Sequence, residues 1–205
     1  MNENLLYTGL ARYFSAAQLE RLRAAHVGVA GAGGLGSNAA LMLTRCGVGH
    51  LLLVDDDVVD ASNLNRQQYW PRHVGQPKVR ALAEILCALN PDLDVDARVL
   101  RLTRSNMTET LACCPCWVEA MDSSEDKSLF VESALLAGCR VASASGMAGC
   151  GGPVMGRRRL GRLVQVGDFV TDVSTAPPLA PRVTQAAGLL ADAVLEMLLG
   201  PSPWC

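Results

Sequence analysis

The sequence lacks a hydrophobic run long enough to cross a membrane, since a spanning helix needs about 20 consecutive apolar residues. Its first ten residues include Glu3 and lack the basic and then apolar pattern of a secretory signal. The 18 basic and 20 acidic residues leave a net charge of −2, which argues against a broad nucleic-acid-binding surface. Without a secretory signal, the eight cysteines predict reduced thiols. We therefore expect a cytoplasmic protein with no membrane or nucleic-acid partner.

Lysine is also scarce. Lys78 and Lys127 are the only two lysines, and every other basic residue is arginine. Hydrophobic residues, in contrast, make up 50% of the 205 residues, which is enough to bury a core and excludes global disorder. The length suits a single domain over 1–205. Within it we expect an N-terminal helical segment (about 1–25), a nucleotide-binding core (about 26–145), and a hairpin, crossover and final helix (about 146–200).

Predicted strands and helices alternate along the chain. Apolar runs and one alternating pattern predict strands over 27–30, 51–54, 93–99, 117–121 and 140–144. Helices are expected over 15–25, 37–46, 77–90, 105–113, 125–137 and 182–199. A hairpin is expected within 154–166, followed by an irregular crossover over 168–181. This order predicts an α/β fold: a Rossmann-like, mostly parallel sheet with flanking helices and a late antiparallel hairpin at one edge.

A glycine-rich turn joins the first predicted strand to the next helix. Gly31, Gly33 and Gly36 form the pattern G-x-G-x-x-G, which allows a tight turn and brings backbone N–H groups close to phosphate. Asp55 follows the second predicted strand, about 20 residues further on, where a carboxylate accepts hydrogen bonds from ribose hydroxyls. The pattern predicts an adenine nucleotide as the ligand. Because Gly-Lys-Ser/Thr is absent, a P-loop NTPase is disfavoured.

Two cations follow this motif closely. Arg66 and Lys78 suit an enzyme that breaks the bond between the α- and β-phosphates of ATP, because negative charge builds up on the departing pyrophosphate. Arginine offers a planar fork to phosphate oxygens, and lysine offers a point charge. Asn63 and Gln67 would fix the ribose or a phosphate through neutral hydrogen bonds.

Several sequence runs now carry a specific resemblance. They are G-A-G-G-L-G at 31–36, V-D-D-D-V-V-D-A-S-N-L-N-R-Q at 54–67 and G-Q-P-K at 75–78. On these runs the chain resembles the ubiquitin-activating superfamily, and within it the ThiF/MoeB family of sulfur carrier protein adenylyltransferases. The resemblance extends from about residue 12 to residue 199. The segments 118–122, 142–149 and 179–183 look most similar to the short ThiF branch.

The resemblance implies a role for each matching residue. Asp55 would hold the ribose, with Ser62 and Asn63 nearby, and Asp57 matches the family pattern. Asp122 matches the acid that positions Mg²⁺, and one aspartate suffices because magnesium prefers one or two carboxylates plus phosphate oxygens. The predicted ATP site is Gly31, Gly33, Gly34, Gly36, Asp55, Asp57, Ser62, Asn63, Arg66, Gln67 and Lys78, and the predicted catalytic set is Arg66, Lys78 and Asp122.

The resemblance also implies a reaction. The C-terminal carboxylate of a small ubiquitin-like sulfur carrier protein ending in Gly-Gly would attack the α-phosphate of ATP, giving an acyl-adenylate and pyrophosphate. A carboxylate needs no general base, so catalysis would consist of positioning and charge stabilisation. A sulfur donor would later convert the adenylate to a thiocarboxylate for thiamine thiazole synthesis. Family members form homodimers, and the same is expected here.

The sequence departs from the relatives at three places. MoeB-type enzymes use an arginine from the neighbouring subunit; the matching position here is Ser15, with Arg12 nearby, so the sequence leaves open whether a second copy supplies a cation. Larger relatives bind zinc through two C-x-x-C pairs, whereas this chain has one, Cys113 to Cys116, and no zinc is expected. The predicted crossover has no cysteine, which leaves Cys150 as the candidate reactive thiol.

Other residues have structural interpretations. Cys46, Cys87 and Cys139 fall on helix or strand patterns and are expected in the core. The run 157–159, which is Arg-Arg-Arg, is expected to be a solvated face of the hairpin, with a docking patch for an acidic carrier as the alternative.

Alternative functions stay open at this point. They are an NAD-linked oxidoreductase on the same core, a MoeB-like enzyme, a tRNA-modifying relative that adenylates a small carboxylate, and a non-catalytic scaffold that binds nucleotide or carrier. The oxidoreductase does not explain the run Ser-Asn-Leu-Asn-Arg-Gln at 62–67.

Overall fold

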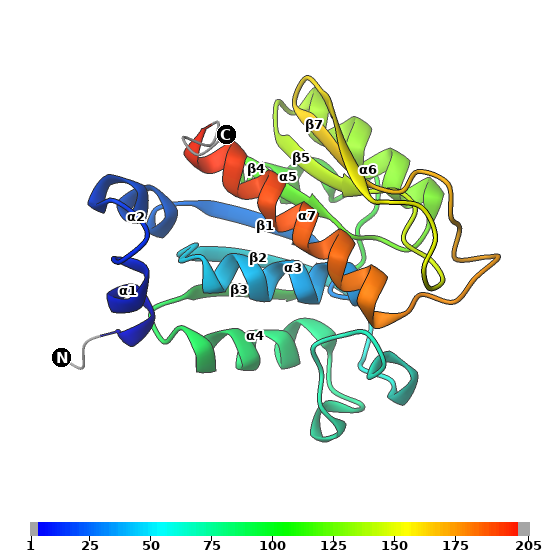
Figure 1. Ribbon diagram of the computed structural model, residues 1–205, viewed down its shortest axis with the longest axis horizontal. Coiled ribbons are helices and arrows are strands. Elements are labelled where there is room, and N and C mark those ends of the chain that lie inside the picture. The colour runs from blue at the N-terminus through cyan, green and yellow to red at the C-terminus, as the bar shows by residue number, and fades with distance from the viewer. Residues whose placement is uncertain (1–3, 201–205) are drawn as a thin grey trace.

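The computed structural model describes residues 4–200 and is built on a seven-stranded sheet in the order β3-β2-β1-β4-β5-β7-β6 (Figure 1). All neighbouring strands are parallel except β6 and β7, which form an antiparallel pair at one edge. The predicted α/β architecture is therefore confirmed. The strands are β1 (His26–Ala30), β2 (His50–Asp55), β3 (Asp94–Val99), β4 (Cys116–Glu119), β5 (Arg140–Ala144), β6 (Gly156–Leu160) and β7 (Leu163–Gly167).

Helices cover both faces of the sheet, so its central strands are apolar on both sides (Figure 1). Among the described helices, none has the length and hydropathy needed to span a bilayer. α3, α4 and α7 pack on one face, and α5 and α6 pack on the other. The helices are α1 (Leu5–Leu10), α2 (Ala16–Arg23), α3 (Gly34–Arg45), α4 (Lys78–Leu89), α5 (Met107–Leu111), α6 (Ser124–Leu136) and α7 (Ala180–Leu199).

The strand order reverses beside β1, since β2 lies on one side of it and β4 on the other. In open parallel sheets the crevice at such a reversal, beyond the carboxyl ends of the strands, is where ligands bind. The segments that follow β1, β2 and β4 carry the glycine turn, Asp55 to Asp57, and Asp122. The topology therefore brings the residues predicted from sequence to one end of the sheet.

Three details differ from the expectations. Helix α3 begins at Gly34 rather than Ser37, because the glycine turn itself supplies the first helical residues. The short helix α1 lies within the expected N-terminal helical segment, although the only helix assigned there was 15–25. Cys87 is exposed, whereas a core position was expected; the buried side of α4 runs through Val79, Leu82 and Leu86, and Cys87 falls outside it. Of the other two predicted core cysteines, Cys139 is buried and Cys46 is half-buried.

The N-terminal helices lie at the amino ends of the strands, away from the glycine turn (Figure 1). The Tyr7 hydroxyl lies 3.4 Å from the carbonyl oxygen of Gly47, and the Arg23 guanidinium lies 4.0 Å from the centre of the Tyr7 ring. Ser15 caps α2, since its hydroxyl accepts a hydrogen bond from the Gln18 N–H. Ser15, which the sequence resemblance matched to the arginine of MoeB-type enzymes, is thus a helix cap in this chain.

Candidate active site

The glycine turn follows β1 and requires glycine at two positions for steric reasons. Gly31 has φ of +93°, and a Cβ there would lie 2.4 Å from the carbonyl oxygen of Ala120. A Cβ on Gly36 would lie 1.8 Å from the carbonyl oxygen of Gly31. Both distances are far below any real Cβ contact. The turn thus packs backbone against backbone, and the first N–H groups of α3 remain available for an anion.

A cavity of about 230 Å³ opens beyond the carboxyl ends of β1, β2 and β4. Six residues predicted from the sequence line it: Gly31, Gly33, Asp55, Asp57, Lys78 and Asp122. The structure adds Asp56, Arg101 and Asp126, together with an apolar wall that includes Leu100, Leu102 and Met121. Gly34, Gly36, Ser62, Asn63, Arg66 and Gln67 do not line the cavity.

Asp55, the last residue of β2, braces the glycine turn. Its Oδ2 accepts a hydrogen bond of 2.6 Å from the N–H of Ala32, and its Oδ1 accepts one of 2.8 Å from the N–H of Asp57. Burial raises the pKa of Asp55, while the two N–H bonds and Lys78 oppose that rise. Each carboxylate oxygen keeps a lone pair for a further donor, such as a ribose hydroxyl.

Lys78 is a buried cation at the cavity wall. Its side chain is 7% exposed, and its Nζ lies 2.6 Å from Oδ2 of Asp57. The backbone N–H of Lys78 also donates to the carbonyl oxygen of Asp57 at 2.9 Å. Lys78 is the first residue of α4, where a positive charge opposes the helix dipole. Lys78 is therefore not a surface lysine.

Arg66 and Gln67 lie behind the glycine turn rather than in the cavity. Cβ of a side chain at Gly34 would be 3.5 Å from Cγ of Arg66, and one at Gly33 would be 3.8 Å from Nε2 of Gln67. The Arg66 guanidinium donates to Oδ1 of Asn65 at 2.8 Å. Oε1 of Gln67 is buried without a hydrogen-bond partner among residues 4–200. The segment therefore lies beside the glycine turn, with the stem of Arg66 near Gly34 and the amide nitrogen of Gln67 near Gly33.

Ser62 and Asn63 belong to a 3₁₀ turn, Ala61–Asn63, that presents Arg66. The carbonyl oxygen of Ser62 accepts a hydrogen bond of 3.2 Å from Nη1 of Arg66. Oδ1 of Asn63 accepts one of 3.0 Å from the N–H of Asp60. In this structure both residues shape the loop, and neither reaches the cavity.

The acidic residues of the cavity fit a hard divalent cation. The Asp122 side chain is exposed and has no hydrogen bond or ion pair within the described part of the chain. One oxygen each of Asp55, Asp56 and Asp57 also lie within 4.8 Å of one another. Asp57, however, is paired with Lys78, and Asp55 is bonded to two N–H groups. Asp122 is therefore the freer oxygen donor, and its chemistry matches what Mg²⁺ prefers.

Sequence reasoning missed the residues that fix this site in place. The buried Tyr69 hydroxyl lies 2.7 Å from the carbonyl oxygen of Ala32 and 3.2 Å from that of Lys78, so it links the glycine turn to α4. Glu119 is fully buried and paired with Lys127 at 2.8 Å. The rarity of lysine was the only signal in the sequence for Lys127.

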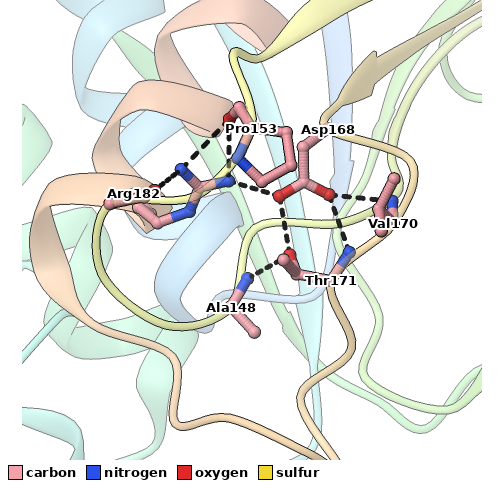
Figure 2. A network of polar contacts seen from close by, with 7 residues as sticks. Ala148, Pro153, Asp168, Val170, Thr171 and Arg182 are labelled. Carbon is pink, nitrogen blue, oxygen red and sulfur yellow. Dashed lines mark hydrogen bonds and ion pairs between the residues drawn. The ribbon is translucent and has the colours of Figure 1, made fainter.

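A second buried ion pair, between Asp168 and Arg182, lies where the crossover meets α7 (Figure 2). The Asp168 carboxylate also accepts hydrogen bonds from the N–H groups of Val170 and Thr171 at 2.9 and 2.8 Å and from the Thr171 hydroxyl at 2.7 Å. Arg182 donates to the carbonyl oxygen of Pro153 at 3.3 Å. One ion pair thus connects the loop after β5, the turn after β7 and the first turn of α7.

The arginine run of the hairpin is exposed but largely engaged within the chain. Arg157 and Arg159 form ion pairs with Glu196 of α7, and Arg157 also pairs with Asp192 at 3.1 Å. Arg158 stacks over the Phe169 ring at 4.0 Å. The prediction of an exposed hairpin face is confirmed, and the ion pairs weaken the alternative of a docking patch.

None of the cysteines within residues 4–200 lines the cavity at the carboxyl ends of the strands. Cys113 and Cys114 line a second cavity, of about 180 Å³, together with residues at the beginnings of β1, β2 and β3. That cavity lies at the amino ends of the strands, because His26, His50 and Asp94 begin β1, β2 and β3. Cys150 is exposed in the loop between β5 and β6.

Comparison with known proteins points in one direction. A model of the ThiF family matches residues 7–203. The adenylyltransferase and sulfurtransferase UBA4 of Yarrowia lipolytica is 37% identical over 126 residues, which are 62% of this chain and 32% of that protein. The SAMP-activating enzyme E1 of Haloferax volcanii is 43% identical over 104 residues, which are 50% of this chain and 38% of that protein. The chain thus matches only about a third of the length of these two curated relatives.

Solved structures share the fold at low identity. E. coli tRNA N6-threonylcarbamoyladenosine dehydratase aligns with a TM-score of 0.88 and 21% identity, covering 95% of this chain and 94% of that chain. Its complex with ATP aligns with a TM-score of 0.84 and 22% identity, covering 95% and 94%. E. coli MccB with ATP aligns with a TM-score of 0.74 and 19% identity, covering 96% of this chain and 64% of that chain. At these identities the likeness establishes the fold.

Proposed function

The chain belongs to the ThiF family, and from this premise we propose that it is an ATP-dependent adenylyltransferase. Its substrate would be the C-terminal carboxylate of a small ubiquitin-like sulfur carrier protein ending in Gly-Gly. The observation that carries the proposal is the meeting of the glycine turn, Asp55, the buried cation Lys78 and the unpaired carboxylate Asp122 around one cavity. The names of the curated relatives support the same class of reaction.

Each group has a role that its surroundings favour. The N–H groups at the start of α3 would face the phosphates, and Asp55 would accept hydrogen bonds from the ribose. Lys78 would stabilise the charge that grows on pyrophosphate as the bond to the α-phosphate breaks. Arg66 lies beside Gly34. Its planar guanidinium would bind phosphate oxygens after releasing Oδ1 of Asn65. Bound Mg²⁺, held through Asp122, would supply further positive charge to the phosphate oxygens.

No general base is required for this reaction, because the attacking carboxylate is already ionised at neutral pH. Rate enhancement would come from alignment of carboxylate and α-phosphate and from preorganised charge. For the pathway we propose thiamine thiazole synthesis, for the location the cytoplasm and for the assembly a homodimer, all resting on the resemblance to the short ThiF branch.

A tRNA-modifying activity is the second candidate, because the E. coli dehydratase matches this chain over nearly the full length of both proteins. The net charge of −2 weighs against it, since tRNA binding relies on basic surface. The two candidates separate on one observation, namely whether the activated carboxylate belongs to a protein or to an RNA nucleoside.

The central prediction concerns ATP–pyrophosphate exchange. Purified protein with Mg²⁺ and a sulfur carrier ending in Gly-Gly is expected to incorporate labelled pyrophosphate into ATP. A carrier truncated by the two glycines is the matched control and should give no exchange. Exchange with unfractionated tRNA but with no carrier would reassign the substrate, and binding of the intact carrier without any exchange would favour the scaffold.

A second prediction concerns the pH dependence of nucleotide binding. Because the pKa of Asp55 is raised, its ionised form is lost at a higher pH than that of an ordinary aspartate, which titrates near about 4. ATP affinity is therefore expected to fall as the pH is lowered from 7 towards 4.5. Calorimetry on wild type and Asp55→Asn tests this. The phosphates of ATP titrate equally in both experiments, so the difference between the two pH profiles reports on Asp55. The asparagine variant should bind more weakly at pH 7 and lose less affinity on acidification. Parallel profiles would contradict this role of Asp55.

A further inference from the structure

Glu119, the last residue of β4, is a fully buried carboxylate that the proposed reaction does not use. Its Oε2 lies 2.8 Å from Nζ of Lys127 and accepts a hydrogen bond of 2.6 Å from the Ser143 hydroxyl. Its Oε1 accepts a hydrogen bond of 2.8 Å from the N–H of Met121. A charge buried this deeply persists only with such partners, because its desolvation is costly.

Lys127 connects this carboxylate to two other elements. Its Nζ also donates to the carbonyl oxygen of Ala144, the last residue of β5, at 3.0 Å. Lys127 itself lies in the first turn of α6, where a cation is unfavourable for the helix dipole. Glu119 offsets that cost. The ion pair thus fastens the start of α6 to the carboxyl ends of β4 and β5.

The segment 120–123 is held between these attachments, and it carries Asp122. The N–H of Ala120 donates to the carbonyl oxygen of Ala30 at 2.8 Å, and the carbonyl oxygen of Ala120 lies against Gly31. The next N–H along the chain, that of Met121, donates to Oε1 of Glu119. The backbone before Asp122 is thus fixed by these bonds, and α6 after it is fastened through Lys127, yet the Asp122 carboxylate is left exposed to the cavity.

We propose that Glu119 and Lys127 are positioning residues that hold Asp122 where it binds the divalent cation that accompanies the nucleotide. The inference rests on the proposed function for the role of Asp122. Neither residue lines the cavity, so they act through the backbone of 120–123 and through α6. Their removal is therefore expected to weaken the metal more than the nucleotide.

The test measures binding and needs no turnover. The probe is the ATP analogue with a methylene bridge between the α- and β-phosphates. Its dissociation constant is measured by calorimetry with Mn²⁺ and with EDTA. The constant in EDTA divided by the constant in Mn²⁺ gives the contribution of the metal. Asp122→Asn gives the ratio expected when the carboxylate that binds the metal is absent. Glu119→Gln and Lys127→Met, which keep the side-chain shapes, are expected to lower the ratio by about tenfold, as loss of an outer-shell partner does.

Controls separate positioning from general destabilisation. Asp168→Asn weakens the other buried ion pair and is expected to lower stability while keeping the wild-type ratio. A folded Glu119→Gln protein with the wild-type ratio would overturn the inference. So would an Asp168→Asn protein whose ratio falls as far as that of Glu119→Gln, or an Asp122→Asn protein whose ratio is unchanged. If neither principal variant folds, Ser143→Ala decides: it loses one hydrogen bond to Glu119, and a ratio equal to wild type would again overturn the inference. Absence of pyrophosphate exchange in wild type would reject the proposed function and leave this binding test intact.

Discussion

Replacing Lys78 by methionine is expected to lower the rate of adenylate formation by about 100-fold or more, the usual cost of removing one preorganised charge from a transition state. The lysine side chain is 7% exposed, and its Nζ is held 2.6 Å from Oδ2 of Asp57 at the cavity wall. Methionine keeps the unbranched stem and removes only the charge. Rapid-quench measurement of adenylate formation, with the nucleotide and a Gly-Gly carrier at saturation, gives the rate.

The same substitution is expected to leave the free energy of unfolding within about 1 kcal/mol of wild type. Asp57 is 63% exposed in its side chain, so water replaces its lost partner, and the start of α4 is relieved of an unfavourable cation. Arg80→Met on the same helix is the matched control. Arg80 is exposed, and its guanidinium makes no hydrogen bond or ion pair among residues 4–200. Urea unfolding and exchange rates are compared for all three proteins. Lys78→Met with a rate within threefold of wild type would contradict the assignment.

Local sequence patterns were sufficient to predict the glycine turn and the acid at the end of β2. The glycine turn and Asp55 follow from a motif whose spacing is set by one β-strand, one helix and the next β-strand. Lys78 was marked by the scarcity of lysine and by its closeness to the motif, whereas the role of Asp122 needed the resemblance to relatives. Both line the cavity because the strand order places the segments that follow β2 and β4 on either side of β1, at the carboxyl ends of the strands.

The supporting residues could not be predicted, because their partners are distant in the chain and many are backbone atoms. The Tyr69 hydroxyl bonds to the carbonyl oxygens of Ala32, in the glycine turn, and of Lys78, at the start of α4. Glu119 meets Ser143 through strand register, which no local pattern reveals. The same applies to exposure within a helix: Cys87 is apolar enough for a core, and only the packing of α4 decides that it faces outward.

The turn after β7 illustrates how an irregular segment gains its structure. Phe169 has φ of +62° and is the one non-glycine residue with positive φ in the described chain. Such a conformation costs free energy and needs support from its surroundings. The support comes from Asp168, whose carboxylate accepts hydrogen bonds from the two N–H groups of Val170 and Thr171 (Figure 2). Arg182 completes it from α7, and its neighbour Val183 lies against Gly34 of the glycine turn.

Replacing Arg182 by methionine is accordingly expected to lower the free energy of unfolding by about 3–5 kcal/mol, the cost of leaving a buried charge without its partner. The Asp168 side chain has no exposed surface, and the Arg182 side chain is 8% exposed. The carbonyl oxygen of Pro153 also loses its donor. Urea unfolding at pH 7 measures the loss, and a loss below about 1 kcal/mol would contradict it. Arg159→Met, which removes an exposed ion pair, is the control and is expected to cost less than about 1 kcal/mol.

The pH dependence of the free energy of unfolding tests the same ion pair independently. Burial alone would raise the pKa of Asp168, but hydrogen bonds from Thr171 and Val170 and the ion pair with Arg182 lower it to about 2. A carboxylate with a lowered pKa stabilises the fold above the pKa of the unfolded chain, and that contribution disappears as the pH falls through the folded value. Wild type is thus expected to lose it between about pH 4 and 2. In Arg182→Met the folded pKa rises towards the unfolded value, so the loss still begins near pH 4 but ends at a higher pH and is smaller. Asp168→Asn should lack it, because its side chain does not titrate.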